Sequence, residues 1–253
     1  MRQPCMDLPH VGRLMIMQNM EKGKKPVFTW FTPVALGLGV LFLYLSRPAV
    51  IIDRKKPDQT EAVNNARQMG FALHEFETEY GRFPDAKTAA MLREKGKTAW
   101  KLEGNSSNDL FRQLVASGHL KDERILYART AFTQKPDGQM TPPEKALAAG
   151  EVGFGYVMNG NTGFDTKGDP TRPLAVAPLA FDGKTVSSRI FDVRPFDHKA
   201  VLLRSDNSAT SLPILKKTKE AMLGRGKSLL ETGPDTVWGD GITPIIATPL
   251  PKR

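Results

Sequence analysis

The segment Asn65–Leu92, NARQMGFALHEFETEYGRFPDAKTAAML, carries the clearest structural pattern in this chain of 253 residues. Within it and just before it, apolar residues recur at spacings of three and four, the period of one helix face: Ala62, Ala66, Met69, Leu73, Phe76 and Tyr80. Most charged residues of the segment fall outside this stripe. The pattern predicts a long amphipathic helix with one buried face, and we expect a sheet to cover that face.

Signals at both ends bound the predicted helix. Asp58 or Thr60 can cap its start. At its end, Gly81 suits the left-handed position that follows a helix, and Pro84 prevents the helix from resuming. Phe83 lies between these two residues and can fold back over the last turn. The helix is therefore expected to end in a tight turn, after which the sequence DAKTAAML starts a second helix.

An apolar segment precedes this helix. Val27–Leu45, VFTWFTPVALGLGVLFLYL, contains no charged residue, and at about 1.5 Å per residue it nearly spans a hydrocarbon core of about 30 Å. Trp30 and Tyr44 lie near its ends, where aromatic side chains favour the headgroup region. We interpret residues 27–46 as one uncleaved transmembrane anchor.

Two other interpretations of the apolar segment were weighed. A buried core helix fits poorly, because the apolar run is uninterrupted and flanked by charge on both sides. A cleaved signal peptide also fits poorly, because Arg47 and Pro48 stand where a cleavage site needs small residues. Positive charges are nearly balanced across the segment, so they barely indicate an orientation.

The predicted organisation has five parts along the chain. They are a cytoplasmic N-terminal segment at 1–26, the anchor at 27–46, a linker at 47–57, an α+β domain at 58–216 and a C-terminal extension at 217–253. Cys5 is the only cysteine, so the chain can form no internal disulfide and no zinc site of several cysteines.

Within the α+β domain, the sequence after the long helix predicts a short helix and then an antiparallel sheet. Ser106 or Ser107 caps the short helix, Leu110, Phe111, Leu114 and Val115 face inward, and Gly118 ends it. About four strands are expected to form the sheet that covers the helix stripe: residues 152–158, 173–179, 199–204 and 209–214. The extension at 217–253 is rich in proline and glycine, and Trp238 could pin it to the domain.

The order of these segments resembles that of type IV pilin-like proteins. The helix followed by the turn at Tyr80, Gly81, Phe83 and Pro84 is most similar to the G-type major pseudopilin of type II secretion systems. Three stretches of sequence resemble pseudopilin-like proteins of Verrucomicrobia-type bacteria: NNARQMGFALHEFETEYGRFPD, SSNDLFRQLVASGHLKDERILYA and ALAAGEVGFGYV. The resemblance covers about residues 60–213 and implies a pilin-like fold that works by protein contact.

The chain departs from the family at the prepilin cleavage motif. Pro26 and Val27 precede the Phe-Thr pair, and Thr32 stands where pilins carry a glutamate. Pro48 and Pro57 interrupt the continuous helix that pilins use for stacking. We therefore expect a permanent anchor that prepilin peptidase does not process.

Few residues suggest catalysis or metal binding. The four histidines give no metal-binding pair, and His74 is expected at the surface. His198 with Asp197 and Asp206 can be drawn as an acid–base set, but a polar cluster at a strand edge explains them better.

Calcium is the one metal that the resemblance raises, because G-type pseudopilins hold it near hairpin loops. Asp182, Asp206 and Asp240 lie in loop-like contexts, but turn chemistry accounts for each of them. We assign no catalytic, cofactor-binding or metal residue from the sequence.

The sequence thus favours a non-enzymatic, pseudopilin-like protein of the cell envelope, in or derived from a type II secretion or type IV pilus-type assembly. It would cross the inner (cytoplasmic) membrane once, hold its C-terminal domain outside the cytoplasm and contact protein partners. A net charge of +9 favours the alternative, an extracytoplasmic module that binds polysaccharides or anionic polymers. A third hypothesis is a hydrolase that uses His198. A nucleic-acid partner is not expected, because no recognition motif accompanies the scattered basic residues.

Overall fold

Helix α2 (Lys55–Tyr80) is the long helix that the apolar spacing predicts. In this computed structural model, which describes residues 55–253, all six residues of the predicted stripe are at most 7% exposed. Residues 55–57, expected in the linker, are already helical, so Asp58 and Thr60 lie inside α2 and do not cap its start as predicted. None of the helices described in residues 55–253 is long and apolar enough to cross a membrane, and the predicted anchor lies outside them.

The turn after α2 has the predicted form. Gly81 has a φ of 78°, and its amide donates to the Glu77 carbonyl at 2.7 Å. Phe83 is fully buried and folds back so that its ring meets the His74 ring edge-on, with 5.7 Å between centroids. His74 is therefore half-buried, and its expected place at the surface was wrong because Phe83 covers it.

Three short helical segments follow the turn. They are α3 (Ala86–Glu94), α4 (Ser107–Ser117) and the 3-10 helix η2 (Glu123–Leu126). Helix α4 has Ser106 as its N-cap and Gly118 in the left-handed conformation at its end, which confirms the predicted bounds.

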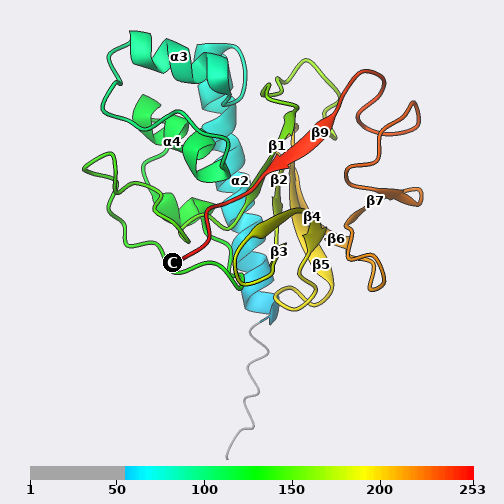
Figure 1. Ribbon diagram of the computed structural model, residues 1–253. Helices are drawn as coiled ribbons and strands as arrows, with labels where there is room; N and C mark the ends of the chain where they lie inside the picture. Colours follow the sequence, from blue (N-terminus) through cyan, green and yellow to red (C-terminus); the bar gives the residue numbers. More distant parts are fainter. Residues whose placement is uncertain (1–54) are drawn as a thin grey trace, which may run out of the picture. The chain divides into compact units, whose positions relative to one another are not determined.

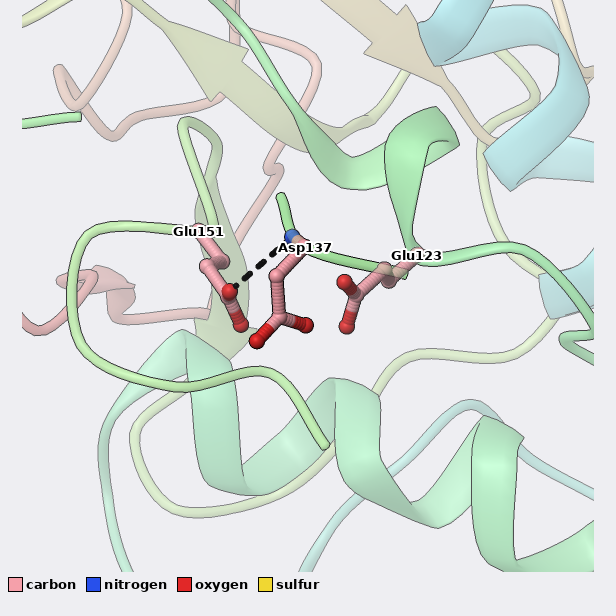
Figure 2. A group of neighbouring side chains, drawn as sticks. All are labelled: Glu123, Asp137 and Glu151. Carbon is pink, nitrogen blue, oxygen red and sulfur yellow. Dashed lines mark hydrogen bonds between the residues drawn. The ribbon is translucent and has the colours of Figure 1, made fainter. Parts of the chain in front are cut away.

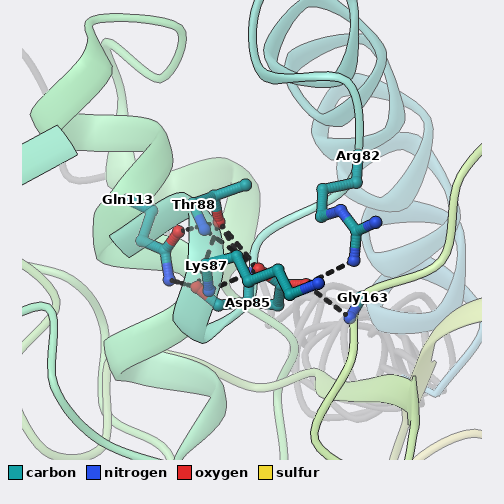
Figure 3. Close-up of polar contacts among 6 residues, drawn as sticks. All are labelled: Arg82, Asp85, Lys87, Thr88, Gln113 and Gly163. Carbon is teal, nitrogen blue, oxygen red and sulfur yellow. Dashed lines mark hydrogen bonds and ion pairs between the residues drawn. The ribbon is translucent and has the colours of Figure 1, made fainter. Parts of the chain in front are cut away.

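Asp85 joins α3 to α4 and to a distant loop (Figure 3). It is 1% exposed, and its carboxylate accepts hydrogen bonds from the amides of Thr88 at 3.0 Å and Gly163 at 3.1 Å. Gln113 of α4 donates to the Asp85 carbonyl at 2.9 Å and accepts from the Thr88 hydroxyl. One capping box therefore also positions the second helix.

An antiparallel sheet of five strands, in the order β6-β5-β2-β1-β9, forms the other layer of this α+β fold. Its strands are β1 (Gly155–Asn159), β2 (Pro173–Ala177), β5 (Lys199–Arg204), β6 (Ala209–Pro213) and β9 (Pro244–Ala247). Two small hairpins lie outside it: β3 (Leu179–Phe181) with β4 (Val186–Phe191), and β7 (Met222–Gly224) with β8 (Lys227–Ser228).

The first four strands of the sheet match the prediction, and the fifth comes from residues 217–253, which were expected to be an extension. Strand β9 pairs with β1 in the register Val157↔Ile246, so the end of the chain completes the sheet (Figure 1). The expected pinning by Trp238 is confirmed: it is fully buried, donates to the Leu229 carbonyl at 2.8 Å and stacks on Phe164. Residues 217–253 belong to the same compact unit as the rest, Asp53–Arg253.

Helix α2 passes behind the sheet (Figure 1) and packs against β5 and β6, with Gly70 at a close approach to the hairpin. A β-carbon at Gly70 would lie 1.8 Å from Oδ1 of Asn207, at the hairpin turn, and 3.0 Å from Cδ1 of Leu203. Any β-carbon at residue 70 therefore requires the side chain of Asn207 to move.

Replacing Gly70 by alanine is expected to lower the free energy of unfolding by about 1 kcal/mol, because overpacking outweighs the gain in helix propensity of about 1 kcal/mol. Urea unfolding measures the change. In an Asn207→Gly background the same substitution should lose most of its cost, since the clashing side chain is gone and glycine suits the Asn207 φ of 63°. Asn64→Ala, on an exposed part of α2, is the control and should be neutral or stabilising; a stabilising Gly70→Ala in the wild-type background would contradict the close crossing.

Candidate functional site

Three carboxylates converge beside η2, as Figure 2 shows. Glu123 comes from η2, Asp137 from the long connection that follows, and Glu151 from the residues just before β1. One oxygen of each lies within 4.8 Å of the others. Glu123 is 0% exposed and Glu151 is 2% exposed, whereas Asp137 is open to solvent.

Backbone amides hold these carboxylates in place. Glu123 accepts from the Gly138 amide at 2.6 Å through Oε1. Glu151 accepts from the Ala148 amide at 2.6 Å and from the Asp137 amide at 3.3 Å. The cluster therefore ties η2 to two turns of the connection to β1, and each turn contributes an amide as well as a side chain.

One oxygen of the cluster has no partner. Glu123 Oε2 is buried and makes no hydrogen bond of normal geometry, although a buried carboxylate oxygen normally requires one. Burial is the main cause that raises the pKa of Glu123, and the neighbouring Glu151 carboxylate raises it further, whereas the Leu147 backbone only lowers it by a smaller contribution. Burial likewise raises the pKa of Glu151, with a smaller contribution in the same direction from Asp137.

No lysine or arginine among residues 55–253 forms an ion pair with any of the three carboxylates. Arg112 of α4 lowers the pKa of Glu151, as the last of the contributions to its shift. Its guanidinium, however, pairs with Asp109 and donates to the carbonyls of Ala146 and Leu147, both at 2.9 Å. The negative charge of the cluster is therefore left largely uncompensated.

The cluster can be reached from solvent. A surface cavity of about 330 Å³ is lined by Glu123 and Asp137, with Lys121, Arg124 and Met140 on its walls. A small cation can enter this cavity and meet the exposed carboxylate of Asp137 before the buried one of Glu123. Chemically, the arrangement offers hard oxygen ligands and lacks any nucleophile paired with a base.

The residues considered from the sequence as an acid–base set are not brought together. His198 precedes β5 and Asp206 follows it, so they lie beyond opposite ends of this strand. The His198 amide donates to the Val193 carbonyl at 2.9 Å, and Asp197 is exposed. His198, Asp197 and Asp206 therefore do not form one acid–base set, because β5 separates His198 from Asp206.

The three aspartates considered for calcium also lie in separate connections. Asp182 accepts from the amides of Lys184 and Thr185 in the β3–β4 turn, and these hydrogen bonds lower its pKa to about 2. Asp206 accepts from the Ser208 amide at 2.8 Å, and Asp240 is exposed before β9. Turn chemistry thus accounts for the first two, as expected.

No pattern in the sequence predicts the cluster of Glu123, Asp137 and Glu151. Its members are spaced by 14 residues and come from irregular structure, so no helix or strand period relates them. Asp122 is a local signal for the position of Glu123. It caps η2 by accepting a hydrogen bond from the Arg124 amide, and this cap places Glu123 in the first turn of η2.

Comparison with family models, curated proteins and solved structures finds no match to this chain. The resemblance to pseudopilin-like proteins thus stays a prediction from the sequence.

Without divalent cations, the stability of the protein is expected to rise as the pH is lowered from 7 to 5. The folded-state pKa values of Glu123 and Glu151 lie above their usual value of 4.5, so the folded protein takes up protons above pH 4.5 that the unfolded chain does not. This gain is complete below pH 4.5 and is lost as the pH rises through the folded-state pKa values.

Urea unfolding at pH 7, 6 and 5 tests this expectation. Glu123→Gln should flatten the pH dependence and raise the free energy of unfolding at pH 7 by roughly 1 kcal/mol, since it removes a buried charge without changing the shape. Asp122→Asn, which alters an exposed acid next to the cluster, should leave the pH dependence unchanged. A stability that falls between pH 7 and pH 5 would contradict the expectation.

Proposed function

We propose that this chain is a membrane-anchored, non-enzymatic pseudopilin-like protein of the cell envelope. It acts by protein–protein contact in, or derived from, a type II secretion or type IV pilus-type assembly. Its location is the cytoplasmic membrane, crossed once, with the domain outside the cytoplasm. The observation that carries the proposal is helix α2: it follows the apolar segment of residues 27–46, buries one face under an antiparallel sheet and ends in the Gly-x-Phe-Pro turn.

The exposed side of α2 supplies a surface for contact. Phe71 is 63% exposed there, the highest value among the large apolar side chains found exposed in residues 55–253. Arg67, Gln68 and Glu75 on the same helix are also exposed. An aromatic anchor rimmed by polar residues is typical of the energetic centre of a protein interface.

The alternative is a module that binds polysaccharides or anionic polymers. Its support is the net charge of +9, which is a property of the whole chain and does not define a site.

Membrane anchoring is tested by fractionating cells that express the full chain with a C-terminal tag. The protein should remain in the membrane after carbonate extraction, and protease applied outside the cytoplasmic membrane should remove the tag. Leu38→Arg with Val40→Arg should release it, because each arginine at the centre of a span costs about 2.5–3.5 kcal/mol. Leu38→Ala with Val40→Ala is the matched control; wild-type protein in the soluble fraction would contradict the proposal.

Contact through α2 is tested with Phe71→Ser. Cross-linking in cells should show protein complexes that this variant reduces about tenfold, since removing an interface anchor commonly costs more than about 1.4 kcal/mol. The melting temperature should stay the same, because Phe71 is exposed. Met91→Ser, at a position that is 40% exposed on α3, is the control and should keep the complexes; equal loss in both variants, or in neither, would argue against α2 as the contact surface.

A further inference from the structure

Glu123, whose Oε2 has no hydrogen-bond partner, lies beside two other carboxylates. Figure 2 shows the side chains of Glu123, Asp137 and Glu151 turned toward one another, with Asp137 between the two glutamates. Glu123 is 0% exposed and its Oε2 has no hydrogen-bond donor. A buried anionic oxygen in such a group requires either a proton or a cation.

The dimensions of the cluster suit calcium. Its oxygens lie within 4.8 Å of one another, and two ligands on opposite sides of a Ca²⁺ ion, at about 2.3–2.6 Å each, are about 4.6–5.2 Å apart. Mg²⁺ demands near-ideal octahedral geometry, whereas Ca²⁺ accepts an irregular set of oxygen ligands such as carboxylates from three separate segments. Zn²⁺ prefers nitrogen and sulfur ligands, and neither histidine nor cysteine is in the group.

The carboxylates retain the lone pairs that a cation needs. Amides engage Oε1 of Glu123 and both oxygens of Glu151, but each oxygen can accept a second interaction. Oε2 of Glu123 is free, and the exposed Asp137 leaves room for water to complete the coordination of a Ca²⁺ ion.

We propose that Glu123, Asp137 and Glu151 form a Ca²⁺ site. The ion clamps η2 to the two turns of the connection before β1, a stretch that holds little regular structure of its own. This site lies apart from Asp182, Asp206 and Asp240, the loop aspartates considered from the sequence, and it does not depend on the proposed function.

Titration of the chelator-treated full-length chain with CaCl₂, in mild detergent, tests the site. Calorimetry should show one binding event with a dissociation constant at or below about 1 mM. The melting temperature should rise by about 3–5 °C at a Ca²⁺ concentration about ten times the dissociation constant. MgCl₂ at the same concentration should shift it less. No heat and no shift with CaCl₂ up to 10 mM would overturn the proposal.

Three variants separate a metal site from a cluster that only binds protons. Asp137→Asn should weaken Ca²⁺ binding at least about tenfold while leaving the melting temperature in chelator unchanged or slightly raised, because asparagine keeps the acceptor for the Gln139 amide and removes a charge that repels Glu123 and Glu151. Glu123→Gln should abolish the Ca²⁺ shift. Asp122→Asn, in the same cavity wall but outside the cluster, should bind Ca²⁺ within twofold of the wild type. Equal Ca²⁺ affinity in Asp137→Asn and the wild type would overturn the proposal.

Discussion

The crossing of helix α2 against the β5–β6 hairpin constrains everything built around it. At Gly70 the helix backbone approaches so closely that a β-carbon would overlap Asn207. This approach lets the apolar stripe, from Ala62 to Tyr80, lie against the sheet. Four consecutive residues of β5, Ala200 to Leu203, are buried, so both faces of this strand are covered.

The same helix positions the acidic cluster. Asn65, on α2, donates through its side chain to the carbonyl of Arg124 at 3.1 Å and to that of Tyr127 at 2.9 Å. These bonds hold η2 against the helix, and η2 in turn presents Glu123 to Asp137 in the long connection. A cation bound there would stiffen the segment packed on α2, the helix through which we propose that the protein contacts its partners.

Local signals in the sequence predicted much of the helical layer correctly. Ser106 and Gly118 bound α4, and the left-handed Gly81 ends α2, because caps depend on neighbouring residues alone. Strand β9 was not predicted, because Pro244 opens it and Pro249 follows it. Short apolar runs between prolines indicate loops as readily as edge strands. His74 was wrongly predicted to lie at the surface, because Phe83 packs on it only after the chain turns back.

The candidate site could not be derived from the sequence. Hydrophobic period, caps and turn residues act over a few positions, so the amino-acid order was enough to establish an amphipathic helix, four strands and an α+β class. Three features join residues that are far apart in the chain: the pairing of β9 with β1, the close crossing at Gly70, and the cluster of Glu123, Asp137 and Glu151. Such contacts form only when the packed layers bring irregular segments together. Burial then removes water from the Glu123 carboxylate, which requires a proton or a cation in its place.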